Sequence, residues 1–354
     1  MPQPGPIRDR VAGVVLAAGA STRFGSPKQL ARVGEGTMLE AAIDVARRAG
    51  LRPILAVVPP GLAVPPDVVP VVNADPAAGL SRSLQLGIGA VPPEASAAVI
   101  LLGDQPSLDP AVIRRLLGAR DGAGFVAAVD PTGVVAPPVL IERAGFETVV
   151  NIAGDEGLRH LLRDGGVEVL RVQVATHPPD IDAQDDLAAV ERCPGCGGIF
   201  TARPDITEHP YIGASSGCWA TFNEVLARGY SDPTYGRVHR HTVDVYAVQH
   251  PGRDHRRERQ SVALHLIGLC HWLEHAKSDD RLNSITQRLA SEKRDWPWLT
   301  PPSGYRMDVR DLVAAEDGAE HVRLVRAWAK SVWEAWSAHH ELVRQWASEA
   351  LVGG

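Results

Sequence analysis

The sequence predicts an α/β protein whose three-layer, mostly parallel sheet is followed by a second, mainly α-helical domain. Strand-like apolar segments alternate with helix-like segments between residues 11 and 192, as in sheets with helices on both faces. A chain of 354 residues is long enough for two domains. Residues 1–192 contain no Cys, Trp or Tyr, which is hard to reconcile with a single core. We therefore expect one domain over 1–192 and another over 193–354.

The first strand is predicted from Val11, where an apolar run ends in a loop of small residues. Thr37-Met-Leu-Glu40 is a capping box that predicts a helix ending near Gly50. Asp109 and Pro110 predict the N-cap and first residue of another helix. We expect the other strands at 54–58, 68–72, 97–102, 125–129 and 167–174, and the other helices from residue 80, over 156–163 and over 184–191.

The loop after the first strand has the character of a phosphate site. The segment from Val11 to Leu30 reads VAGVVLAAGASTRFGSPKQL. Its small residues let backbone N–H groups approach a ligand, and Arg23 and Lys28 add positive charge. Lys28 is the only lysine in the first 192 residues, which favours a role for a compact ammonium. A Walker A loop and a G-x-G-x-x-G fingerprint are both absent, so the loop predicts another kind of nucleoside triphosphate site.

Two carboxylates are candidates for holding Mg²⁺. Asp104 follows a predicted buried strand in LLGDQP, and Asp182 precedes a predicted helix. Both should lie at the carboxyl edge of the sheet, and Mg²⁺ prefers carboxylate oxygens together with substrate phosphates. The structural alternative for Asp104 is a turn or N-cap residue, while Asp180 and Asp185 compete with Asp182.

These segments together resemble the MobA-like nucleotidyltransferases, whose signature is LAAG-x-S-x-R-[MF]-G-x-P-K-x-L. GDQP at 103–106 is typical of the molybdenum cofactor cytidylyltransferase branch. NADPAAGLSRSLQLG at 73–87, GDEGLRHLL at 154–162 and DIDAQDDL at 180–187 match later landmarks of the family. The resemblance implies Mg²⁺-dependent transfer of a nucleoside monophosphate, CMP from CTP, onto a phosphorylated acceptor such as molybdopterin, with release of pyrophosphate.

The resemblance also implies a set of site residues. Arg23, Lys28 and Asp104 are the implied catalytic residues, and Asp104 and Asp182 the implied Mg²⁺ ligands. The implied nucleotide-binding residues are Leu16, Ala17, Ala18, Gly19, Ser21, Arg23, Lys28, Asn73, Gly79 and Ser83.

One departure from the family pattern concerns the acceptor. The cytidylyltransferase branch usually carries Gly-His-Pro before the Val-Leu at 139–140, where this chain has Ala136-Pro137-Pro138 in an expected loop. Without that imidazole, transfer to another acceptor, such as a sugar phosphate, stays open. The alternative of another class is a catalytically inactive nucleotide-sensing or scaffold protein.

The second domain begins with a zinc-knuckle-like CPGCGG sequence. Cys193 and Cys196 can hold one tetrahedral Zn²⁺, and Cys218 is the best third ligand. His209, His239 and His241 compete for the fourth position. The alternative to a structural zinc is a pair of reduced or redox-active thiols.

Three predicted helices complete the second domain. Over 239–252 and 260–275, His241 and Asp244 share one helix face and His265 can meet them, as a metal site or as structural polar groups. We expect His271 and His275 at the surface or partly buried. A final helix over about 321–350 carries an apolar stripe that predicts core packing: Trp328, Val332, Trp336, Val343 and Trp346.

This half resembles a bacterial family of unknown function, marked by CPGCGG, Gly217-Cys218-Trp219, TVDVYAVQHPG and QSVALHL. Regulation, delivery of the acceptor and dimerisation are open roles for it.

The charge and hydropathy of the chain limit the classes of molecule that it is expected to bind. The net charge of −6 without a basic run argues against nucleic acid. No apolar stretch reaches membrane-spanning length, and the first residues lack a signal-peptide core. We expect a cytoplasmic protein that binds a nucleoside triphosphate and a phosphorylated small molecule. The resemblance adds a molybdoenzyme maturation partner.

Overall fold

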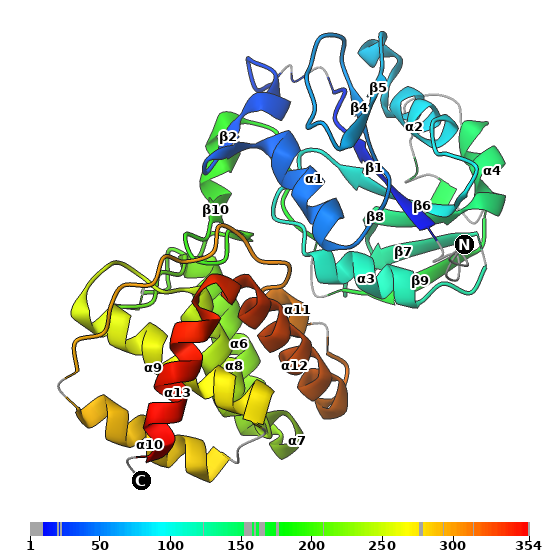
Figure 1. Cartoon of the computed structure of the whole chain (residues 1–354). Coiled ribbons are helices and arrows are strands. Elements are labelled where there is room, and N and C mark those ends of the chain that lie inside the picture. Colours follow the sequence, from blue (N-terminus) through cyan, green and yellow to red (C-terminus); the bar gives the residue numbers. More distant parts are fainter. Residues whose placement is uncertain are drawn as a thin grey trace, which may run out of the picture. The chain divides into compact units, whose positions relative to one another are not determined.

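The computed structural model describes residues 10–19, 21, 23–122, 124–151, 158, 161–162, 167–174, 177–207, 209–275, 279–292, 294–313 and 315–352. It divides into two compact units, an α/β unit over Met1–Val190 and a helical unit over Glu191–Gly354 (Figure 1). Most of the helix expected over 156–163 lies outside the described residues.

A seven-stranded sheet in the order β5-β4-β1-β6-β8-β7-β9 forms the centre of the α/β unit. Every strand runs parallel to the others except β8, which pairs antiparallel with β6 and β7. The mostly parallel sheet is therefore confirmed. Its strands are β1 (Arg10–Leu16), β4 (Ile54–Val58), β5 (Val68–Val72), β6 (Ala95–Leu102), β7 (Phe125–Val129), β8 (Val135–Glu142) and β9 (Val169–Gln173).

Helices cover both faces of this sheet (Figure 1). Alternate residues of β1 belong to two different cores, because side chains on a strand point to opposite faces. Val11 and Val15 pack with residues of α1 (Met38–Arg48) and α3 (Pro110–Gly118). Ala12 and Val14 pack with residues of α2 (Leu80–Gly89) and α4 (Phe146–Val150). The result is three layers.

The predicted helix starts are confirmed in detail. The Thr37 side chain accepts a hydrogen bond from the Glu40 N–H, and the Glu40 carboxylate accepts one from the Thr37 N–H, so the capping box is complete. The Asp109 carboxylate accepts the Ala111 N–H at 2.8 Å. Both caps satisfy amide groups that a helix start leaves without partners.

Two local expectations are corrected in this unit. The segment 184–191 forms the 3₁₀ turn η4 (Gln184–Ala189) and then strand β10 (Val190–Arg192), because pairing with β11 (Ile199–Thr201) draws the chain into an extended form. The expected loop around Pro137 and Pro138 lies within β8. The register between β7 and β8 shifts at this level, and a bulge of this kind tolerates residues that lack an N–H.

Short elements that the sequence analysis did not predict complete the α/β unit. They are the hairpin strands β2 (Arg32–Val33) and β3 (Gly36–Thr37) and the 3₁₀ turns η1 (Lys28–Leu30), η2 (Pro76–Ala78) and η3 (Arg143–Gly145).

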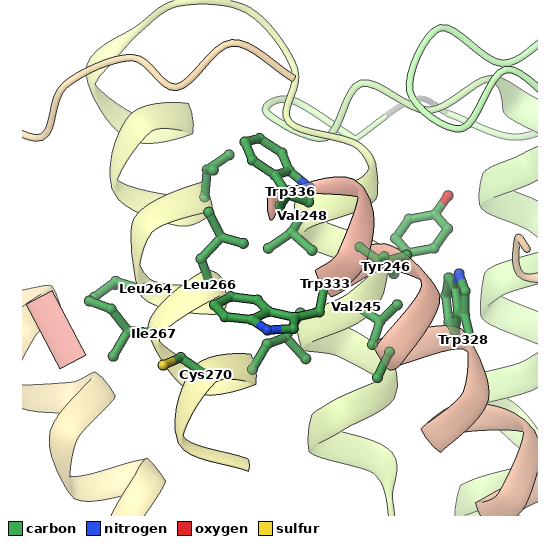
Figure 2. Packing of buried hydrophobic residues seen from close by; sticks show 14 of the residues in the cluster. Val245, Tyr246, Val248, Leu264, Leu266, Ile267, Cys270, Trp328, Trp333 and Trp336 are labelled. Atoms are coloured by element: carbon green, nitrogen blue, oxygen red, sulfur yellow. The ribbon is translucent and has the colours of Figure 1, made fainter. Parts of the chain in front are cut away.

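The helical unit contains a core rich in tryptophan. Figure 2 shows Trp328 and Trp333 of α12 packed near Tyr246 of α8 and Leu266 of α9. The predicted apolar stripe of five residues is buried throughout, so its role in the core is confirmed. The helices are α6 (Ser216–Ser231), α7 (Pro233–Gly236), α8 (His239–Gln249), α9 (Arg256–His275), α10 (Asp279–Ser291), α11 (Arg310–Val313), α12 (Gly318–Ala335) and α13 (His340–Val352).

The final helix is not continuous, which corrects the expectation of one helix. It breaks at Trp336 and passes through the 3₁₀ turn η5 (Ser337–His339) into α13. The imidazole of His340 stacks on Trp333 and hydrogen-bonds its carbonyl oxygen at 2.8 Å. The break lets α13 pack on α9 while α12 also packs on α8. Across the part of the chain that the structure describes, no helix is long and apolar enough to cross a membrane.

Candidate functional site

The loop after β1 is held by polar side chains from its own motif. The buried Gln29 amide donates to the carbonyl oxygens of Ala17 and Gly19 at 2.7 and 3.0 Å. The Lys28 N–H donates to the Ser21 hydroxyl at 3.0 Å. Gln29 was not predicted as a site residue, although an amide between Lys28 and the apolar Leu30 in the middle of the motif was a usable signal. These bonds give the loop a fixed curvature.

Backbone contacts bring the two predicted carboxylates together. The Gly103 N–H donates to the Leu16 carbonyl at 2.9 Å, and a Cβ on Gly103 would lie 2.8 Å from the Ala17 Cβ. Glycine is therefore needed where the ends of β1 and β6 meet. The Ile181 N–H donates to the Asp104 carbonyl at 2.9 Å, which sets Asp182 beside Asp104.

The competing carboxylates have other environments. Asp180 accepts a hydrogen bond from the Gln105 amide at 2.8 Å, and Asp185 is exposed in η4.

Lys28 lies between the two carboxylates. Its Nζ is 2.6 Å from Asp104 Oδ2 and 3.1 Å from Asp182 Oδ1, while Arg23 contacts Asp182 Oδ2 at 2.8 Å. Burial lowers the pKa of Lys28, but its bonds and charge interactions with the two carboxylates outweigh burial and raise that pKa. Burial also raises the pKa of Asp104, against the opposing hydrogen bond from Lys28. Asp104 Oδ1 is buried without a hydrogen-bond partner in the described part of the chain.

Most of the predicted nucleotide-binding residues surround one cavity of about 170 Å³. Ser21 lines a second, more open cavity of about 460 Å³ that shares Ala18 and Gly19 with the first. The Arg23 side chain is 74% exposed and lines neither cavity. Asn73 is fully buried, and its amide donates to the hydroxyl of Ser83, which lines the first cavity, at 2.9 Å. The predicted residues in the first cavity are Leu16, Ala17, Ala18, Gly19, Lys28, Gly79, Ser83 and Asp104.

A second cluster lies in the helical unit, where three thiols and one imidazole converge. Cys193 and Cys196 occupy the turn between β10 and β11, Cys218 lies in the first turn of α6, and His250 follows α8. All four are buried, and their candidate ligand atoms lie within 4.8 Å of one another. The Cys218 sulfur is 4.0 Å from that of Cys196 and 3.3 Å from His250 Nε2. These separations suit one small tetrahedral ion.

His250 corrects the prediction for the fourth ligand. Its Nδ1 bonds the Tyr246 carbonyl at 2.8 Å, which leaves Nε2 facing the sulfurs, as in many metal-binding histidines. The three predicted candidates lie outside this cluster: His209 packs on Tyr211 and Trp219, His239 on Tyr230, and His241 on Trp272.

The pKa of Cys193 is shifted in the opposite direction from the pKa values of Cys196 and Cys218. Burial raises the pKa of Cys196 and of Cys218. At Cys193, hydrogen bonds from the neighbouring thiols and the charge of His250 outweigh burial, and the pKa is lowered. The Ser215 N–H and the Tyr246 hydroxyl approach the sulfurs of Cys193 and Cys218 at 3.5 and 3.4 Å. The cluster is suited to binding a metal ion, because a cation would stabilise all three thiolates.

The predicted meeting of His265 with Asp244 is confirmed. The two side chains hydrogen-bond at 2.7 Å, and His241 Nδ1 lies 3.8 Å from the same carboxylate. His271 is fully buried, contrary to expectation, because α9 packs against four other helices rather than on the surface. His275 is exposed, as expected.

Two families account for most of the chain. Residues 13–172 match the MobA-like NTP transferase domain, and residues 191–337 match DUF5946, a family of unknown function. The first part of the chain is therefore similar to the MobA-like NTP transferases and the second part to this uncharacterised family.

Individual relatives cover half of the chain or less. The bifunctional protein GlmU of Hyphomonas neptunium is 31% identical over 158 residues, which are 40% of this chain and 34% of GlmU. The chain thus spans about a third of the length of that relative. The crystal structure of Rv0371c from Mycobacterium tuberculosis is 32% identical, with a TM-score of 0.45, over 50% of this chain and 95% of that one. A further structure of Rv0371c contains manganese; it is 31% identical, with a TM-score of 0.44, over the same shares of the two chains.

Proposed function

We propose that residues 1–192 transfer CMP from CTP to a phosphorylated acceptor and release pyrophosphate. The observation that carries this proposal is the convergence of Lys28, Asp104 and Asp182 at the small-residue loop after β1. Two carboxylates and a protonated ammonium at one point suit a polyphosphate and its counter-ion. The family match supports the coarser reaction, a nucleotidyl transfer.

The donor set fits Mg²⁺. Asp104 has a buried carboxylate oxygen without a partner among the described residues. The ammonium of Lys28 contacts both Asp104 and Asp182, so a positive charge already lies between the two carboxylates. These two residues would hold the ion. When bound, Mg²⁺ would neutralise charge on the reacting phosphates.

The chain's own residues orient the triphosphate. Small residues from Ala17 to Gly19 leave backbone groups open to it, and Gln29 keeps that backbone in place. Lys28 and Arg23 turn from the carboxylates to the phosphates and offset charge that develops on the leaving pyrophosphate. An acceptor phosphate is already ionised at neutral pH, so the transfer needs no strong general base.

The acceptor we propose is molybdopterin, on the strength of GDQP at 103–106. Ala136-Pro137-Pro138, where the branch usually has a histidine, favours a second candidate, a sugar phosphate. The catalytically inactive nucleotide sensor stays the alternative of another class.

Pyrophosphate release by the full chain tests these proposals. CTP, GTP and ATP are each supplied with Mg²⁺ and either molybdopterin or a hexose 1-phosphate. We expect release with CTP and molybdopterin. Release with the sugar phosphate alone moves the assignment to the second acceptor. CTP binding without release from any pair contradicts the transferase and supports the sensor.

For the second cluster we propose a structural Zn²⁺ held by Cys193, Cys196, Cys218 and His250. Four buried sulfur and nitrogen donors leave no open position, which is typical of structural zinc. Metal analysis of the purified full chain should find one zinc per chain. A chain that is folded without stoichiometric metal contradicts this assignment.

A further inference from the structure

A cavity of about 700 Å³ lies beside the cysteine cluster, within the helical unit. Its walls come from four segments, 191–195, 209–215, 251–258 and 301–302. We call it the proline cavity, because five of its lining residues are prolines. Its size is in the range of sites for small organic ligands.

The proline-rich part of the cavity wall offers few backbone hydrogen-bond donors. Proline contributes a carbonyl oxygen but no N–H. The backbone N–H groups of residues 213–215 are already engaged, since they donate to the carbonyl oxygens of His250 and Ile212 and to the Cys193 sulfur at 3.1, 2.9 and 3.5 Å. A ligand group that contacts this part of the wall therefore meets carbonyl oxygens rather than free N–H groups.

Glu258 is the polar side chain that makes this cavity a candidate site. It lies in the first turn of α9, lines the cavity and is only 8% exposed. Among the described residues its carboxylate makes neither a hydrogen bond nor an ion pair. The start of α9 favours a negative charge, but this effect leaves the carboxylate oxygens without partners. The carboxylate lines the cavity, so a donor bound there can reach it and complement its charge.

Basic side chains lie among the exposed lining residues. Arg253 and His255 both line the cavity and are exposed. Arg192 lines it too, and its guanidinium is anchored on the Gly197 carbonyl at 2.8 Å. This distribution suits a ligand with an anionic group at its outer end. The rings of His209 and Tyr211 also line the cavity and pack edge to face, with their centroids 4.4 Å apart. They add flat aromatic surface to the walls.

We propose that the proline cavity binds a flat ring ligand that presents two adjacent N–H donors to Glu258 and an anionic group to Arg253 and His255. Guanine and pterin rings have such a donor pair, which matches the two oxygens of a carboxylate. Adenine and cytosine place an acceptor beside their amino group, and this acceptor would face the carboxylate. The ligand is therefore a guanine nucleotide or an anionic pterin. This site is separate from the proposed transferase site, so either assignment can fail alone.

Calorimetric titration of the full chain tests the proposal, with CTP present to occupy the transferase site. The probes are GMP, IMP, AMP and pterin-6-carboxylate. IMP is the matched ligand control, because it differs from GMP only by the missing 2-amino group. We expect a Kd below about 100 µM for GMP or for the pterin. IMP and AMP should bind about tenfold more weakly than GMP if the guanine nucleotide is the ligand. Selective binding of the pterin identifies the other source if Glu258→Gln weakens it, because the proposed acceptor of the transferase site is also a pterin.

Glu258→Gln tests the role of the carboxylate, with Glu341→Gln as its matched control. Glu341 is an exposed acidic residue in the first turn of α13, so it also lies near a helix start but does not line the proline cavity. Glu258→Gln should weaken binding about tenfold, and Glu341→Gln should leave it unchanged. Failure of both GMP and the pterin to bind, or equal binding to the wild type and Glu258→Gln, overturns the proposal. If Glu258→Gln does not fold, the wild type still decides: equal binding of GMP and IMP without binding of the pterin overturns it.

Discussion

The two candidate metal sites of this chain are built in opposite ways. In the α/β unit, Asp104 and Asp182 lie at a half-open sheet edge and share the ammonium of Lys28. In the helical unit, three cysteines and His250 form a buried cluster in which the candidate ligands face one another. The first arrangement keeps positions available for a substrate and the second does not. Under the proposed assignments, one chain would keep a reactive metal site apart from a structural one.

Removal of a sulfur from the buried cluster should have the largest effect. Cys218→Ser should abolish metal binding and unfold the helical unit, because a structural zinc contributes about 10 kcal/mol or more of folding free energy. Calorimetric unfolding combined with metal analysis measures both. Cys270→Ala is the control, since Cys270 is buried but lies outside the cluster. Retention of the zinc and of folding in Cys218→Ser would erase the contrast between the sites.

Asp104→Asn should show the reverse pattern, a large loss of turnover without loss of folding. We expect pyrophosphate release to fall about a thousandfold, because the variant loses a charged ligand at the reacting phosphates. Burial raises the pKa of Asp104 above its value in the unfolded chain, so ionised Asp104 contributes no net stability to the folded state. The unfolding temperature of the α/β unit should therefore stay the same or rise. Activity near the wild-type level would refute the metal role of Asp104.

Lys28→Met sharpens the comparison at the open site. The variant loses the ammonium that contacts both carboxylates, and kcat/KM for CTP should fall about a hundredfold. Lys330→Met, which removes an exposed lysine of α12, should have no effect in the same assay. A similar fall in kcat/KM in both variants would show that the effect comes from the net charge of the chain and not from the position of Lys28.

The smallest effect concerns an ion pair of the helical unit. Arg344 donates two hydrogen bonds to Glu274 at 2.8 and 2.9 Å, and this contact lowers the pKa of Glu274. A lowered carboxylate pKa means that the pair stabilises the fold above the ordinary pKa of Glu and is lost as the pH falls through the lowered value. Arg344→Met should lower the unfolding temperature by a few degrees at neutral pH and by less in acid. Scans of both chains across pH check this, and a constant difference contradicts it.

Much of the fold of the α/β unit, and much of the site around Lys28 and Asp104, could be predicted from local sequence. The capping residues Thr37 and Asp109 bond to N–H groups three and two residues further on, so their helices were predictable from local sequence. Asp104 and Lys28 belong to compact motifs at the ends of strands, and parallel strands bring such ends to one edge.

The remaining features depend on contacts between distant segments. His250 joins the cluster because the end of α8 meets the β10–β11 turn, and a Cβ on Gly195 would lie 2.4 Å from its ring. No spacing rule encodes that approach. Strand β8 was missed because two prolines precede its apolar residues, and the bulge that accommodates them depends on pairing with β7.

The confinement of all eight tryptophans and all five tyrosines to positions after residue 192 has a practical consequence. Tryptophan fluorescence, excited at wavelengths that only indole absorbs, reports on the helical unit alone. The α/β unit contributes no emission under these conditions. A change in that emission when CTP is added to the full chain would therefore be a direct signal of communication between the two halves.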